Sequence, residues 1–135
     1  MKFKLNLLTM VPALITLSVA IPKLNQSLKS LESDKTFTAS LSSAPHLQAA
    51  IADASQKWRT VESDEIAAAR NLNIFSKISA VQRLLASAGV LVSSVVADQG
   101  DPAIVAEIAA DPVLSAKLKG LLSNWNAVAG AFAKL

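Results

Sequence analysis

The fold class is decided by residues 111–132, which read DPVLSAKLKGLLSNWNAVAGAF. Apolar residues recur in this segment every three or four positions, as they do on one face of an α-helix. We therefore predict an amphipathic helix over about 112–133 that packs on partner helices through this face. The face is formed by Leu114, Leu118, Leu121, Trp125, Val128 and Phe132.

The residues just before this segment mark the ends of two further helices. Gly100 is placed to end one helix, Asp101 to cap the next, and Pro102 to occupy its first position. Asp111-Pro112 repeats the signal ten residues later. A short helix over about 102–110 is therefore expected to precede the long one.

The composition favours an all-α protein built on small and aliphatic side chains. Hydrophobic residues make up 52% of the 135 residues, whereas aromatic residues make up 4%. Apolar area must then come from Ala, Leu, Val and Ile, which suits closely packed helices. The chain has no Cys, so disulfide and thiolate chemistry are excluded and the redox compartment stays open. The mean hydropathy of +0.41 suggests one apolar segment joined to a more ordinary body.

The N-terminal segment has no charged residue from Leu5 to Pro22, after Lys2 and Lys4. One interpretation is a secretory signal peptide that is cleaved behind Ala20. The other is a retained helix that enters a bilayer or packs on other helices, because its length of about 27 Å approaches the bilayer core. If it spans, the basic start keeps the N-terminus cytoplasmic. The membrane or helix-packing positions are Leu5, Leu8, Val11, Leu14, Ile15 and Leu17.

An internal repeat bears on this choice. The chain aligns with itself without gaps at an offset of 67 residues, and the alignment places Pro45 and Trp58 over Pro112 and Trp125, the only two Trp. We predict a tandem duplication of two helical-hairpin halves, 1–67 and 68–135, that together form one compact helical bundle. The counterpart of the N-terminal segment carries charged residues and cannot be a signal sequence, so the repeat favours retention.

Each half is expected to open with a long helix, over about 4–32 and 72–98. In the first of these helices Pro22 removes a backbone donor, which predicts a kink or break. In the second helix the uncharged stretch 84–97 is too short to cross a bilayer alone, so a buried core helix is the better interpretation. The two Trp are interpreted as core or packing residues in preference to membrane-interface anchors.

No catalytic, metal, cofactor or nucleotide motif is present in the sequence. His46 is the only histidine and has neither Cys nor paired carboxylates nearby, so we expect a surface helix residue and no metal site. The acidic run 62–65 lacks the spacing of a calcium loop and is expected to be a solvated linker or helix start. A net charge of +3 without an Arg-rich stripe argues against nucleic acid as a partner. We therefore expect that the protein is not an enzyme.

The leading hypothesis is a non-enzymatic, membrane-associated helical protein that works by assembly. Its partners are the lipid bilayer, further copies of itself or other helical proteins, because helices rich in Ala, Ser and Gly associate closely. A bacterial envelope, a phage particle or a holin-like membrane protein fits this description. The alternative is a secreted or periplasmic soluble protein that begins behind Ala20 and binds a partner or a hydrophobic ligand. A third possibility is a soluble bundle with 5–21 as its central helix.

Overall fold

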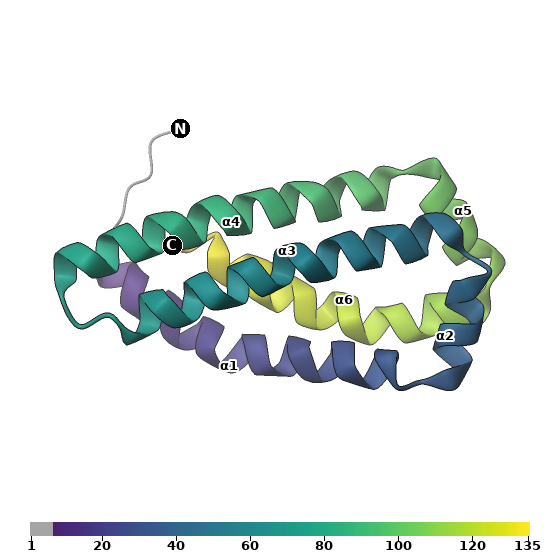
Figure 1. Ribbon diagram of the computed structural model, residues 1–135, viewed down its shortest axis with the longest axis horizontal. Helices are drawn as coiled ribbons and strands as arrows, with labels where there is room; N and C mark the ends of the chain where they lie inside the picture. Colours follow the sequence, from purple (N-terminus) through teal and green to yellow (C-terminus); the bar gives the residue numbers. More distant parts are fainter. Residues whose placement is uncertain (1–6) are drawn as a thin grey trace.

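The computed structural model describes residues 7–135, and these residues form six α-helices and no strand (Figure 1). The all-α fold class predicted from the sequence is confirmed. For the four helices whose bounds were predicted, the structure agrees to within a few residues; the two helices between residues 35 and 70 had no predicted bounds. The long helices are α1 (Leu7–Glu32), α3 (Pro45–Arg70), α4 (Ile74–Gly100) and α6 (Pro112–Phe132), and the short ones are α2 (Lys35–Ser42) and α5 (Pro102–Ala110).

Short polar side chains cap the starts of four helices. These residues are Asp34 for α2, Asn73 for α4, Asp101 for α5 and Asp111 for α6. The carboxylate of Asp101 accepts a hydrogen bond from the N–H of Ala103 at 2.9 Å, with Pro102 in the first turn, as the sequence predicts. At the start of α3 the capping position is Ala44, which offers no side-chain acceptor. The first N–H groups of α3 therefore need an acceptor from elsewhere.

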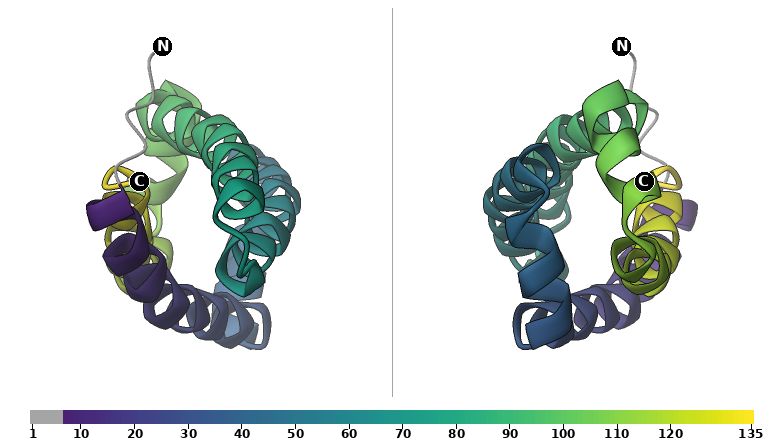
Figure 2. Two further views of the ribbon diagram at one scale, coloured as in Figure 1. Left: turned by 90° about the vertical axis from the view of Figure 1, so that its left-hand side faces the viewer. Right: turned by 90° about the vertical axis from the view of Figure 1, so that its right-hand side faces the viewer.

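The four long helices surround a common axis. α1 and α4 run in one direction and α3 and α6 run back, with both short helices at one end (Figure 1). End-on views place α3 and α4 on one side of the axis and α1 and α6 on the other (Figure 2). The sequence predicts antiparallel helices within each half. The structure corrects this arrangement: α1 with α3 and α4 with α6 pack only weakly, and the most extensive pairings, α3 with α4 and α1 with α6, join one half to the other.

The helices of the two halves begin at matching places along the predicted repeat. The starts of α1, α2 and α3, shifted by 67 residues, coincide with the starts of α4, α5 and α6. Burial recurs at the same offset. Matched buried pairs include Ala13 and Ala80, Leu17 and Leu84, Leu24 and Leu91, Leu47 and Leu114, Trp58 and Trp125, and Val61 and Val128. These matches support a duplication, which remains a prediction about the origin of the chain.

The main core draws on all four long helices, so neither half encloses it alone. Six of its residues have 0% exposure: Leu17, Val61, Ala68, Val81, Leu84 and Val128. Burying a Val or Leu side chain stabilises the fold by about 1.5–3 kcal/mol. A second cluster closes the end near α2 and α5, around Phe37, Ile104 and Leu114.

The break predicted at Pro22 is wrong, because α1 continues without interruption from Leu7 to Glu32. Pro22 lacks an N–H, which frees the carbonyl group of Ser18 from its helical hydrogen bond. Both residues lie on the exposed side of α1, where water can bond to that carbonyl group. A bend without a break stays a prediction.

Candidate functional site

An apolar cavity of about 240 Å³, open to solvent on one side, lies between the helices of the bundle near α5. It sits where the main core and the end cluster meet, because Leu24 and Leu91 from the first and Leu47 and Ile104 from the second share its wall. α1, α3, α4, α5 and α6 all contribute side chains. The long helices therefore leave space between them here that their own side chains do not fill.

Both tryptophans of the chain line this cavity. Trp58 and Trp125 are 5% and 9% exposed, so each indole is held among core side chains. The indole N–H of Trp58 donates to Oδ1 of Asn25 at 2.7 Å, and this bond fixes the ring. The two aromatic groups sit at equivalent places in the two halves and face the same space.

The wall of the cavity is nearly free of polar groups. Ser55, Asp98 and Gln99 are its only polar residues, and the described residues around it include no Lys, Arg or His. Val105 and Leu122 line the cavity while remaining 50% and 37% exposed, so they mark its open side. Such a space suits a neutral apolar molecule.

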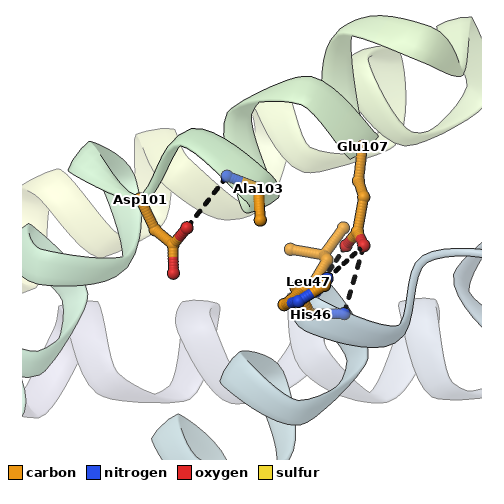
Figure 3. Close-up of polar contacts among 5 residues, drawn as sticks. All are labelled: His46, Leu47, Asp101, Ala103 and Glu107. Atoms are coloured by element: carbon orange, nitrogen blue, oxygen red, sulfur yellow. Dashed lines mark hydrogen bonds and ion pairs between the residues drawn. The ribbon is translucent and has the colours of Figure 1, made fainter.

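Helix α5 forms part of the wall and is fastened to α3 by Glu107 (Figure 3). The Glu107 carboxylate accepts hydrogen bonds from the backbone N–H groups of His46 and Leu47 at 3.2 and 2.8 Å. It also lies 2.8 Å from Nδ1 of His46. Glu107 thus supplies the cap that Ala44 cannot provide. Burial alone raises the pKa of Glu107, but the hydrogen bonds from Leu47 and His46 outweigh it and the pKa is lowered.

The other short helix is fastened in a similar way. Lys117 on α6 forms an ion pair of 2.7 Å with Asp34, the capping residue of α2. This lysine, followed by the N–H of Phe37, lowers the pKa of Asp34. Both short helices are therefore held against long helices by a carboxylate that also caps a helix.

The predicted partner-helix face of α6 turns inward. Leu114, Leu118, Trp125 and Phe132 are buried and Leu121 is half-buried. Leu118, Leu121 and Trp125 reach the cavity. This face is therefore occupied within the bundle.

The predicted membrane or helix-packing segment divides between core and surface. Leu14 and Leu17 are buried, whereas Val11 and Ile15 are 47% and 61% exposed. Leu5 and the side chain of Leu8 lie outside the described residues. One side of this segment therefore belongs to the protein interior, and the other faces outward.

The expectation for the acidic run 62–65 is wrong. It lies within the continuous helix α3, and Glu65 is only 5% exposed. The error has a simple reason: Val61, Glu65 and Ala68 share the inward face of α3 at helical spacing, although the acidic composition suggests a solvated segment. His46 is exposed, as expected. Within 7–135 no three His, Asp or Glu side chains form a group that could hold a metal ion.

Among the described residues, one helical stretch is long and apolar enough to cross a bilayer: Phe75–Gly100, which lies within α4. Only 28% of its most apolar stretch of 18 residues is buried inside the bundle. Val81, Leu84 and Leu91 point into the core, while Val90 and Val96 are 57% and 62% exposed. This helix therefore combines a core face with an apolar outer face.

No family model, curated protein or solved structure matches this chain, so the site rests on its own geometry. Sequence reasoning missed two of its features. The link between Glu107 and α3 joins residues about sixty positions apart, and nothing in the sequence pairs them. For the cavity that both tryptophans line, the one indication in the sequence was the equal Pro-to-Trp spacing of the two halves.

Proposed function

We propose that this chain is a non-enzymatic binding protein that holds a small apolar molecule inside its helical bundle. The observation that carries the proposal is the cavity of about 240 Å³ with Trp58 and Trp125 in its wall. Apolar cavities of about 150 Å³ already bind molecules of the size of benzene. The nearly apolar wall supports a neutral ligand, because a charged group would lose its hydration without gaining a partner.

Tryptophan fluorescence tests this function directly, because both indoles line the site. Titration of the full-length protein with naphthalene, a neutral probe, is expected to change the emission until saturation. The probe at ten times its Kd is expected to raise the free energy of unfolding by about 1.4 kcal/mol. Ala54→Phe fills the cavity and is expected to abolish binding, whereas Ala52→Phe on the exposed side of α3 preserves it. Absence of saturable binding, or equal binding by Ala54→Phe, contradicts the proposal.

A second candidate function, membrane-associated assembly, is favoured by an exposed apolar stripe on α1. Val11, Ile15 and Val19 succeed one another by one helical turn and are 47%, 61% and 57% exposed. The neighbouring hydroxyl groups of Thr16 and Ser18 donate to carbonyl groups of their own helix at 3.0 and 2.7 Å. Side chains of this kind need no water as a partner, so the stripe can face lipid or another helix.

The connection between α3 and α4 lies at the end of the bundle where α1 begins (Figure 1). Leu72 and Phe75, at the connection between α3 and α4, are 98% and 80% exposed. Contiguous exposed apolar groups of this kind are typical of membrane or protein contact. On this proposal the protein lies at a bacterial envelope or in a virion, as a structural or holin-like component that also contacts further copies of itself. The ligand-binding function needs no bilayer and does not depend on cleavage behind Ala20.

Two measurements separate these candidates. Sedimentation with phosphatidylcholine–phosphatidylglycerol vesicles tests lipid binding, which Leu72→Ser with Phe75→Ser should reduce and Val105→Ser, on α5 at the other end, should not. An intact mass of the native protein tests cleavage behind Ala20. Retention of the first twenty residues is supported by the burial of Leu14 and Leu17, because cleavage would remove both side chains from the core. A mass that lacks the first twenty residues would end the membrane proposal.

A further inference from the structure

A second hollow of the surface, the acidic groove, lies between α1 and α3 and has a volume of about 530 Å³. Glu62 and Glu65 on α3 contribute carboxylates to it, and Ile21 and Ile66 contribute apolar walls. It is separate from the cavity with the two tryptophans, with which it shares no lining residue.

The side chain of Glu65 is unusual for its burial. It is 5% exposed, and its Oε1 atom has no hydrogen-bond partner in the described part of the protein. A buried carboxylate without a partner is costly, because it gives up its hydration and receives nothing in return. At the equivalent position of the second half stands Phe132, also 5% exposed. The fold therefore accepts an apolar side chain here, and packing does not require a carboxylate.

The groove is lined by two carboxylates and two cationic side chains, so its charges balance overall, while Glu65 itself has no ion-pair partner among the described residues. Glu62 accepts a hydrogen bond from the amide of Asn25, but the ion pairs among the described residues include neither Glu62 nor Glu65. Lys29 and Arg70 line the groove toward its two ends. Burial, followed by the charge of Glu62, raises the pKa of Glu65. The nearby Lys77 donates to the carbonyl group of Ala68 at 2.7 Å.

We propose that the acidic groove binds a small organic cation, an ammonium group carried on a short apolar body. Glu65 accepts hydrogen bonds from the ammonium, and Ile21 and Ile66 cover the body. An ammonium on an apolar body fits better than a metal ion, because Ile21 and Ile66 line the groove and the described residues form no group of three His, Asp or Glu side chains. Lys29 and Arg70 disfavour an extended basic peptide, since both ends of the groove would repel further positive charge.

Calorimetric titration of the full-length protein with n-butylammonium chloride tests this site. We expect saturable binding to the wild type and binding about tenfold weaker to Glu65→Gln, because a charge-assisted hydrogen bond is lost. Glu32→Gln removes one charge from an exposed position of α1 and serves as the matched control, with binding unchanged. Butan-1-ol, which has the same body without the charge, is expected to bind neither protein at the groove.

Further readouts keep the proposal testable if Glu65→Gln folds poorly. In the wild type, binding should weaken as the pH falls through the pKa of Glu65, and bound butylammonium should lower that pKa. In Trp125→Phe, the emission comes from Trp58 alone and should respond to binding through Asn25 and Glu62. Ala54→Phe should leave butylammonium binding intact. No saturable binding to the wild type, equal binding by Glu65→Gln, or loss of binding in Ala54→Phe would each overturn the proposal.

Discussion

The two halves of the molecule share a framework and differ in their polar groups. Residues buried in α1 and α3 have buried counterparts in α4 and α6 at the offset of 67, including both tryptophans. In the first half Trp58 bonds to Asn25, which bonds to Glu62, whereas the counterparts of these two partners are Val92 and Ala129. The framework thus forms without these polar groups. These polar groups are therefore an addition to the first half that the shared framework does not require.

The largest expected effect tests whether α1 and α4, which open the two halves, contribute equally to the core. Leu17→Ala and Leu84→Ala each remove a side chain with 0% exposure, so each should lower the free energy of unfolding by about 3 kcal/mol. Urea denaturation followed by circular dichroism measures both. Val19→Ala, on the exposed side of α1, should cost less than about 0.5 kcal/mol. If Leu17→Ala lowered the free energy of unfolding no more than Val19→Ala does, α1 would not serve the core as α4 does.

The tryptophans should differ in the cost of losing their indole N–H. Trp58→Phe leaves Asn25 without its donor, whereas no described hydrogen bond involves the indole of Trp125. We expect Trp58→Phe to lower the free energy of unfolding by about 1 kcal/mol more than Trp125→Phe. Denaturation of the two single-tryptophan proteins measures the difference. Equal losses would mean that the bond to Asn25 contributes nothing to stability.

Replacing Glu65 by an apolar residue should make the first half more like the second. Glu65→Leu is expected to raise the free energy of unfolding by about 1 kcal/mol at neutral pH, because a buried charge without a partner is removed. The pKa of Glu65 is raised above 4.5, so the wild type loses stability as the pH rises through that pKa, and the variant lacks this loss. Denaturation at pH 4 and pH 8 checks both expectations. A less stable variant at pH 8 would show that the carboxylate has a partner in solution.

The smallest expected effect concerns the two ways of capping the last helix of each half. α6 is capped by the adjacent Asp111, but α3 depends on Glu107 of α5. Glu107→Gln should lower the Tm by a few degrees at neutral pH. The pKa of Glu107 is lowered below 4.5, so its contribution is present above that value and disappears as the pH falls through the lowered pKa. Thermal melts of the wild type and Glu107→Gln should therefore converge in acid, and a constant difference would contradict this account.

The sequence was sufficient for most of the features that depend on local signals, although α1 continues through Pro22 and α3 through the acidic run 62–65. Asp101-Pro102 and Asp111-Pro112 mark helix starts through short-range hydrogen bonds, and apolar periodicity identifies the buried faces. The sequence was insufficient where distant segments meet. The pairing of α1 with α6 and the apolar cavity depend on three-dimensional packing, and the burial of Glu65 contradicts the usual behaviour of its residue type.

The antiparallel pairing of α1 with α6 has a consequence for chain connectivity. The end of α6 lies at the same end of the bundle as the start of α1, just as the end of α3 lies next to the start of α4 (Figure 1). A circular permutant that joins the termini through a flexible linker and opens between Asn71 and Asn73 would exchange the order of the halves and retain every helix pair. The backbone resembles a closed ring with two interchangeable opening sites.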